Sequence, residues 1–524
     1  MNPNIEPDMT RNMKSETTSQ MQSDNKANKE VNLKTNMSPK SLSKKFISFD
    51  GQESAQGFLY RADKYRNLEK AMQTAGAPMI PSGAQLSYGL SFAGPGIISL
   101  STEIFNRILE FDPMKETITV ESGMTLWDLL TFLVSKGFWF PVLPGYPSIT
   151  IGGCLGSNVH GKSQFQSGNF YDYVQAFTLI HPDHGRMQCS RQNHSDIFDL
   201  TIGGFGFTGF VIQVKLKIQK LKGTQIQKNT IPVSDLVQAA EVIRQHEADC
   251  DQIYSWHDLT LSGARFGSGF VYLEKFVKEP IENKNIIPSQ SFKEDLEGHK
   301  KMNTSQAQKS NIDLITNYYR YKMDFKKSKE LNKLSVLNRQ SRKNQLLSYV
   351  APLAVNATYR FLESIKPKIQ TTDVLSAAFP IQGKEIYYDA FGRRGFCEYQ
   401  MIIPQTHWSE FVKQLQNLVS MSNIQVTLAS LKLFKSPQRY LHFASDGVCL
   451  AIDVVAFSGA LEFFKGLDQL VIQYKGLPNI AKDSRIHQTV VAKCFQQYEN
   501  FKLDLLKFDP KKRFSSSLRD RLGV

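Results

Sequence analysis

Three polar residues with different chemistry lie within five positions of one another: Asn158, His160 and Lys162. They offer an amide donor, an imidazole that can change its charge near neutral pH, and a permanent cation. The adjacent pair Gly152-Gly153 precedes them, and glycine lets backbone N–H groups approach a ligand without an intervening side chain. The pattern is typical of a segment that wraps phosphates or a flat ring and then presents reactive side chains to it.

The run from Phe140 to Lys162 contains three motifs in order: PVLPG, T-x-GG and HGK. It resembles the FAD-binding core of the vanillyl-alcohol-oxidase (PCMH-type) superfamily, and within it the decaprenylphosphoryl-ribose oxidase family. The resemblance implies FAD as the cofactor, wrapped by a set of residues from these motifs: Pro144, Gly145, Thr150, Gly152, Gly153, Ser157, Asn158, His160 and Gly161. A glycine-rich turn region of an unrelated α/β protein is the alternative, which a lone glycine pair would favour.

A second loop, from Ser82 to Gly89, resembles the pyrophosphate loop G-x-G-x-S-x-G of the same superfamily. The resemblance implies cofactor contacts from Gly83, Ser87, Tyr88 and Gly89. Gln85 occupies the position of the second glycine, a departure that bears on the geometry of the loop. Leu86 stands where covalent relatives carry a histidine, and leucine cannot form that bond, so FAD is expected to bind non-covalently. A plain turn is the alternative.

The segment from Gly204 to Gly209 reads GFGFTG, a literal GxGxxG. A Rossmann dinucleotide site requires a helix after this motif. Here Phe210, Ile212 and Val214 alternate with polar residues, which predicts a strand. The Rossmann interpretation is therefore rejected, and the resemblance instead implies FAD contacts from this turn: Gly204, Gly206, Gly209 and Val211.

Two residues are the candidates for catalysis. Lys482 lies in AKDSR, which matches a motif of the related oxidases, and its ammonium group could orient the substrate oxygen and stabilise negative charge. If burial lowered its pKa, Lys482 could act as the base instead. The alternative is an exposed structural lysine. His160 is the second candidate, with a core imidazole bound to a backbone carbonyl as its alternative.

The resemblance also implies a set of substrate-binding residues: Tyr88, Lys162, Gln400, Lys432 and Glu398. Lys432 matches a family lysine that faces the substrate phosphate, and a charge at the edge of a strand is the alternative. Glu398 stands where the family has glutamine, which changes the charge of the pocket. The family's active-site cysteine is replaced by Ala451, two residues before Asp453.

The elements that must position these residues follow from periodicity. Apolar residues at helical spacing predict helices over 60–76, 126–137, 234–246 and 406–421. Alternation and β-branched residues predict strands over 97–101, 117–120, 174–180, 210–218, 396–404, 428–434 and 448–455. An apolar strand is also expected to begin at Phe140. The fold class expected is α+β, a PCMH-type FAD-binding domain with a substrate-binding cap built on an antiparallel sheet.

Domain boundaries follow from composition and from the extent of the resemblance. Residues 1–45 are polar and are expected to be a disordered extension. The FAD-binding domain is expected over 46–222, and a substrate-binding domain over 223–476 with a basic insertion near 295–345. The final segment, 477–524, is expected to return to the FAD-binding domain.

The chain has 524 residues and a net charge of +14. Between Lys300 and Lys343 there are twelve Lys and Arg against three Asp and Glu. This is either a solvated face or a region attracted to an anionic membrane or a phosphorylated substrate. No nucleic-acid module accompanies the charge, so nucleic acid is not expected as a partner.

The six cysteines lack disulfide or metal-ligand spacing, which favours free thiols, no metal site and a cytoplasmic location. The longest apolar run, 346–355, is too short and too polar for a membrane helix. The N-terminus lacks the apolar stretch of a secretory signal.

These observations lead to an FAD-dependent oxidoreductase that oxidises a CH–OH group of a sugar by hydride transfer to flavin. A polyprenyl-phosphate pentose is the substrate implied by the resemblance, and an aldonolactone oxidase of the same superfamily is the alternative enzyme. A non-catalytic, flavin-binding protein of the membrane surface is the alternative outside enzymes. A short-chain reductase and a peripheral membrane contact are the partners that the enzyme hypothesis suggests.

Overall fold

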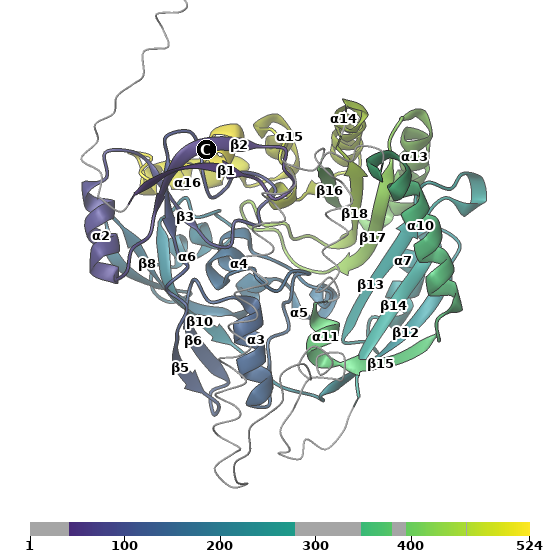
Figure 1. Ribbon diagram of the computed structural model, residues 1–524, viewed down its shortest axis with the longest axis horizontal. Helices are drawn as coiled ribbons and strands as arrows, with labels where there is room; N and C mark the ends of the chain where they lie inside the picture. Colours follow the sequence, from purple (N-terminus) through teal and green to yellow (C-terminus); the bar gives the residue numbers. More distant parts are fainter. Residues whose placement is uncertain (1–40, 278–346, 380–394, 457) are drawn as a thin grey trace, which may run out of the picture.

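The computed structural model describes residues 41–277, 347–379, 395–456 and 458–524 (Figure 1). The first forty residues of the expected N-terminal extension and the basic segment 300–343 lie outside the described residues. The described residues form two lobes, with the first part of the chain in one and most of the second part in the other (Figure 1). We call the described residues of 41–222 and 479–524 the first lobe and those of 223–478 the second lobe.

The first lobe contains two main sheets and a short ribbon. The four-stranded sheet has the order β1-β2-β4-β3, and its β1–β2 pair is antiparallel while β4 runs parallel to β2 and β3. The five-stranded sheet is antiparallel, with the order β5-β6-β10-β8-β9. The bounds are β1 Leu42–Ile47, β2 Ser54–Tyr60, β3 Met79–Ser82, β4 Ile98–Ser101, β5 Ile108–Asp112, β6 Thr117–Glu121, β8 Val174–His181, β9 Gly185–Ser190 and β10 Phe210–Lys217, with β7 Phe138–Trp139 and β11 Gln219–Lys220 in the ribbon.

Helices of the first lobe pack between and around these sheets. They are α2 Tyr65–Thr74, α3 Leu126–Ser135, α4 Ile151–Ser157, α5 Gln164–Ser167 and α6 Ser195–Thr201, with the 3₁₀ turn η1 Phe170–Tyr173. The side chain of Thr125 accepts the N–H of Asp128 at 3.1 Å and so caps α3. The helix then buries Leu126, Leu129 and Leu133, the apolar stripe that its spacing predicts.

The second lobe is built on one eight-stranded sheet with the order β15-β12-β14-β13-β17-β18-β16-β19. Every pair of neighbours in it is antiparallel. The bounds are β12 Gln225–Val233, β13 Gln252–Asp258, β14 Ser268–Phe276, β15 Ile369–Asp373, β16 Phe396–Ile403, β17 Val426–Phe434, β18 Gly447–Val455 and β19 Leu477–Pro478. The predicted α+β class and its antiparallel cap sheet are confirmed.

Helices divide the two faces of this sheet. One face carries α7 Leu236–His246, α13 Trp408–Met421 and α14 Ser458–Gln473, whose apolar residues share a core with Tyr399 and Met401. On the opposite face α10, Leu347–Ile365, covers β14 and β17, where Tyr359 contacts the hydroxyl of Tyr272 at 2.9 Å. Because side chains alternate along a strand, Glu398 and Gln400 lie on this second face. The remaining elements are α11 Val374–Ala378, η2 Gly263–Arg265 and η4 Gln405–His407.

The C-terminal segment lies beside the sheets of the first lobe, where it appears in yellow (Figure 1). Arg513 and Ser515 exchange backbone hydrogen bonds with Met79 of β3. Its elements are η5 Ile480–Lys482, α15 Gln488–Cys494, α16 Tyr498–Phe508 and α17 Ser517–Leu522. The N-terminal strands, the glycine-rich segments and the AKDSR motif are thus brought to one region of the molecule.

Three sequence-based expectations require correction. The extension predicted to be disordered through residue 45 is ordered from Leu42, because β1 pairs with β2. No strand runs on from Phe140, because Pro141 lacks an N–H for a sheet ladder and β7 ends at Trp139. The Gly152-Gly153 pair lies in the first turn of α4 and not in a glycine turn, because Thr150 caps that helix.

Candidate active site

A cavity opens where the two lobes meet. It contains about 1460 Å³ of empty space, part of it continuous with solvent. Of the predicted site residues, those that line it are Gly83, Ser87, Tyr88, Pro144, Gly145, Thr150, Gly152, Gly153, Ser157, His160, Gly206, Gly209, Val211, Gln400, Lys432 and Lys482. Segments separated by up to four hundred residues of sequence therefore meet at one cavity.

Helix α4 forms one wall, and its start is fixed by two close approaches. The hydroxyl of Thr150 accepts the N–H of Gly153 at 3.2 Å, and the carbonyl of Ser122 accepts the N–H of Gly152 at 2.7 Å. A methyl group on Gly152 would lie 3.1 Å from Ser122, and one on Gly83 would collide with the hydroxyl of Thr150. Glycine is therefore required here so that backbone can form the wall of the cavity.

Gln85 adopts a positive φ of 60°, the left-handed conformation that glycine adopts most readily. Its side chain compensates by binding locally: the amide donates to Ser82 Oγ at 3.1 Å, and Lys44 Nζ donates to the amide oxygen at 3.2 Å. The loop thus takes a glycine-like backbone without the glycine that related loops carry at this position.

Lys482 projects into the cavity from η5 with 36% of its side chain exposed. Its Nζ donates to both carboxylate oxygens of Glu398, at 2.9 and 3.0 Å, and lies 5.0 Å from the ring centre of Tyr88. Burial lowers the pKa of Lys482, but the Glu398 carboxylate outweighs burial and the pKa lies above its usual value. This contact favours the cationic form of Lys482 over the alternative in which a lowered pKa makes it the base.

His160 is held among aromatic rings at the opposite wall, with ring centres 4.8 Å from Phe434 and 5.5 Å from Phe443. Burial, together with the charges of Lys432 and Lys482, holds the pKa of His160 well below its usual value. The imidazole is therefore neutral at physiological pH and can accept a proton.

A relay of amides fixes which nitrogen of His160 accepts. The N–H of Ala481 donates to Asn479 Oδ1 at 3.1 Å, so the amino group of Asn479 points to Gln400 Oε1, 2.5 Å away. The amino group of Gln400 consequently faces His160 Nε2 at 3.5 Å. Because an amino group only donates, Nε2 carries the lone pair.

Lys432 lines the cavity from β17. Burial lowers its pKa below the usual lysine value, and the nearby cation Lys482 adds to this effect. An anion bound beside Lys432 would favour its charged form, so the position suits a substrate phosphate.

Six predicted site residues lie outside the lining of the cavity: Lys162, Glu398, Asn158, Gly89, Gly161 and Gly204. Lys162 points into the second lobe, where its Nζ donates to Glu274 at 3.0 Å and to the carbonyl of Ala377 at 2.8 Å. Asn158 ends α4 in a left-handed conformation, and its amide oxygen accepts the N–H of Tyr171. Both residues therefore hold the scaffold together where direct ligand contacts had been expected.

The three glycines outside the lining are needed for packing. A methyl group on Gly161 would lie 2.8 Å from the backbone of Leu143, and one on Gly89 would lie 2.7 Å from Arg521. A methyl group on Gly204 would lie 2.2 Å from the carbonyl of Leu200. Their role is close approach between protein segments.

Among the polar residues of the lining that sequence reasoning missed are Ser122 and Asn479. The hydroxyl of Ser122 is fully buried and has no hydrogen-bond partner among the described residues. Asn479 carries the amide relay to His160. Ser122 follows the end of β6 and Asn479 lies two residues before the start of AKDSR, which are the signals that could have found them.

Comparisons with known proteins agree with this geometry. The family described as FAD binding domain matches residues 61–190. Decaprenylphosphoryl-beta-D-ribose oxidase of Mycolicibacterium smegmatis is 24% identical over 88% of this chain and 92% of that protein. The chain therefore carries an FAD-binding domain of the PCMH type. It is an FAD-dependent oxidoreductase.

Other proteins are similar over shorter stretches of the chain. D-lactate dehydrogenase of Anaerostipes hadrus is 29% identical over 27% of this chain and 31% of that protein. L-gulonolactone oxidase of Mus musculus is 31% identical over 21% of this chain and 25% of that protein. The similarity to the oxidase from Mycolicibacterium smegmatis, by contrast, extends through both lobes.

The cavity fits FAD. Ser122, whose buried hydroxyl has no partner among the described residues, lines it, and the glycines at 83, 152 and 206 bring backbone to its wall, because a Cβ at each would meet protein atoms within 3.3 Å. Leu86 at the lining cannot form a covalent bond to the ring, which agrees with non-covalent FAD. Backbone from the loop at 83–89, α4 and the turn at 206–209 would hold the cofactor.

Proposed function

We propose that this protein oxidises a secondary alcohol of a sugar to a ketone, with a polyprenyl-phosphate pentose as the substrate. The observation that supports this most is the pairing of a fixed cation, Lys482, with a neutral acceptor, His160 Nε2, at one cavity. Oxidation of an alcohol requires the hydroxyl proton to leave and the developing negative charge on oxygen to be stabilised. The two residues divide these tasks.

FAD, when bound, supplies the acceptor for the hydrogen and electron pair that leave the substrate carbon. Lys482 donates to the substrate oxygen and orients the alcohol, because Glu398 keeps its ammonium charged. His160 takes the hydroxyl proton at Nε2 when the substrate hydroxyl replaces the 3.5 Å contact from the amino group of Gln400. Tyr88 positions the ammonium from its ring face.

The phosphate of a polyprenyl-linked substrate fits at Lys432. The similarity to a protein named decaprenylphosphoryl-beta-D-ribose oxidase supports this substrate class. An aldonolactone is the second candidate, supported by the similarity to L-gulonolactone oxidase and by the neutralisation of Lys482, which suits an uncharged substrate.

An anaerobic screen of the FAD-loaded protein tests the proposal. Flavin absorbance is followed while phosphorylated sugars, lipid-linked sugars and aldonolactones are added in turn. Bleaching by a sugar alcohol supports the proposal, and bleaching by lactones alone supports the second candidate. A yellow protein that no compound bleaches would contradict both, and a colourless protein that binds anionic vesicles would favour a non-catalytic surface protein.

The pH profile of flavin reduction follows from the charges of the site. Because the pKa of His160 is lowered, the acceptor is lost only in acid well below the usual histidine range near 6.5. Because the pKa of Lys482 is raised, its charge persists to strongly alkaline pH. We expect the limiting rate of anaerobic reduction to be flat from about pH 6 to about pH 9, as measured by stopped-flow absorbance. An inflection between those limits would contradict these assignments.

A peripheral membrane contact would bring the protein to a lipid-linked substrate. Large exposed apolar side chains gather from the end of α10 to β15, at Phe361, Leu362, Ile365 and Ile369, with Lys366 and Lys368 between them. Such a surface suits the headgroup region of an anionic bilayer. None of the helices that the structure describes has the length and apolar character needed to cross a bilayer. Co-sedimentation with anionic vesicles tests the contact.

A reductase of the short-chain class is the partner that the reaction suggests, since it would reduce the ketone product to the epimeric alcohol. The proposed location is cytoplasmic and peripheral to the membrane. Trapping of a keto sugar when the purified protein acts alone would support a separate reductase.

A further inference from the structure

Two charged side chains line the cavity among the residues that the structure describes, Lys432 and Lys482. They differ in their surroundings. Lys482 is held by both oxygens of Glu398, whose side chain is 6% exposed and is not part of the cavity lining. Among the described residues Lys432 forms no ion pair, and burial lowers its pKa although the charge of Glu398 opposes that shift. The cavity therefore presents two different cations: Lys482, which is paired with a carboxylate, and Lys432, which is not.

A second carboxylate strengthens the neutralisation of Lys482. Asp453 on β18 lies directly opposite Glu398 in the sheet and is 5% exposed. Its charge acts on Lys482 in the same sense as that of Glu398. The surroundings of Lys482 are consequently not positive overall, although an ammonium group faces the cavity.

This charge balance distinguishes between ligand groups. A carboxylate or phosphate that reached Lys482 would also approach the Glu398 carboxylate and would meet like charge in a poorly solvated place. A hydroxyl group can accept from the ammonium without bringing a negative charge toward the carboxylate. The pair thus suits a sugar hydroxyl and disfavours an anion.

We propose that Glu398 is a specificity-determining residue, which neutralises Lys482 and so reserves this part of the cavity for uncharged, hydroxyl-bearing groups of the substrate. A single anionic group of the substrate then binds elsewhere, at Lys432. This inference rests on the proposed function in assigning the cavity to the substrate. It adds that the reacting end of the substrate carries no carboxylate or phosphate.

A second ion pair in the protein provides a matched control. Lys162 and Glu274 are 3.0 Å apart, with side chains 10% and 4% exposed, but neither lines the cavity. Glu274→Gln therefore makes the same chemical change beside a lysine outside the cavity lining. Glu398→Gln makes it beside the lysine that faces the cavity.

The experiment measures binding of oxalate to the FAD-loaded protein by isothermal titration calorimetry at neutral pH. We expect Glu398→Gln to lower the Kd for oxalate at least about tenfold, because a charge-assisted hydrogen bond to Lys482 becomes available. Glu274→Gln should leave the Kd unchanged. The double variant Glu398→Gln/Lys482→Met should lose the gain, because the cation that would bind the anion is absent.

The inference is overturned if Glu398→Gln binds oxalate no more tightly than the unaltered protein, or if the gain survives in the double variant. Equal gains in Glu398→Gln and Glu274→Gln would overturn it as well, since they would reflect net charge alone. Calorimetry of this kind needs no turnover. A negative bleaching screen would therefore count against the proposed function without affecting these titrations. Titrations that overturn this inference would likewise leave the result of the bleaching screen unaffected.

Discussion

Replacement of Lys482 by methionine is expected to slow anaerobic flavin reduction by the substrate about 10²- to 10³-fold, the effect typical of losing one preorganised donor to a developing oxyanion. Methionine keeps the length and apolar character of the lysine stem but cannot donate a hydrogen bond. FAD should remain bound, because the glycine-lined walls at 83, 152 and 206 do not depend on Lys482.

Lys482→Met is also expected to lower the stability of the protein, and the experiment must separate this effect from the loss of the hydrogen-bond donor. Glu398 is buried and would lose its cation, which destabilises the fold because it leaves a carboxylate without its partner in a poorly solvated place. The double variant Lys482→Met/Glu398→Gln removes both charges and restores most of that stability. Its flavin reduction should remain as slow as that of Lys482→Met, because the donor is still missing.

Stopped-flow absorbance gives the rate, and the visible flavin spectrum of the purified protein gives the FAD content. Lys493→Met on α15 is the control, because Lys493 is an exposed lysine of the same C-terminal segment outside the cavity lining. A Lys482→Met protein that holds FAD and is reduced at the unaltered rate would remove Lys482 from the mechanism.

Local signals predicted much of the fold. The apolar stripe and Thr125 identified α3, and the alternation after Gly209 separated a strand from the helix of a Rossmann site. The strands over 396–403 and 447–455 were likewise visible as apolar runs. These elements follow from short-range periodicity, so sequence was sufficient to place them to within a few residues.

The parts that sequence did not predict depend on partners distant in the chain. Lys162 binds Glu274, 112 residues away, and nothing near HGK indicates that the ammonium turns from the cavity. The two glycines at 152 and 153 argue against a helix on propensity, yet the Thr150 cap and the Ser122 carbonyl fix the start of α4. Tertiary contacts override local preference in both cases.

The resemblance identified the two catalytic candidates, Lys482 and His160. It did not predict whether each of them is charged. The choice between a lysine base and a lysine cation depended on whether burial or a carboxylate dominates at Lys482. Glu398 was noted as a departure from the family, but its contact with Lys482 across 84 residues of sequence required coordinates. The sequence-based domain boundaries remain predictions.

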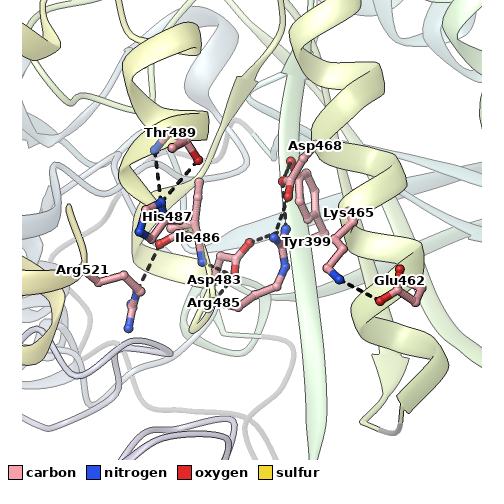
Figure 2. Close-up of polar contacts among 10 residues, drawn as sticks. All are labelled: Tyr399, Glu462, Lys465, Asp468, Asp483, Arg485, Ile486, His487, Thr489 and Arg521. Carbon is pink, nitrogen blue, oxygen red and sulfur yellow. Dashed lines mark hydrogen bonds and ion pairs between the residues drawn. The ribbon is translucent and has the colours of Figure 1, made fainter. Parts of the chain in front are cut away.

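Replacement of Arg485 by methionine is expected to lower the free energy of unfolding by about 3 to 5 kcal/mol, because it leaves two buried carboxylates without their cation. Figure 2 shows Arg485 between Asp468 of α14 and Asp483 of the AKDSR segment. Its guanidinium binds Asp468 with two hydrogen bonds, at 2.6 and 2.9 Å, and lies 3.0 Å from Asp483. Asp468 also accepts the hydroxyl of Tyr399 at 2.8 Å.

This network fixes the segment that carries Lys482. Asp483 accepts the backbone N–H groups of Arg485 and Ile486, and burial raises the pKa of its carboxyl although Arg485 opposes that shift. Tyr399 belongs to β16, the strand that also carries Glu398. The segment that follows Lys482 is thus connected to β16, the strand that carries Glu398. Loss of Arg485 should therefore slow flavin reduction as well as destabilise the fold.

The same region contains a matched control. Lys465 and Glu462 on α14 form an ion pair at 2.8 Å, with side chains 56% and 71% exposed (Figure 2). Lys465→Met should cost at most about 1 kcal/mol, because water already screens that pair. Arg485→Lys should recover only part of the loss, because an ammonium cannot reproduce the two parallel hydrogen bonds to Asp468. Urea unfolding of the FAD-loaded proteins measures all three, and equal losses for Arg485→Met and Lys465→Met would show that the network does not hold the segment.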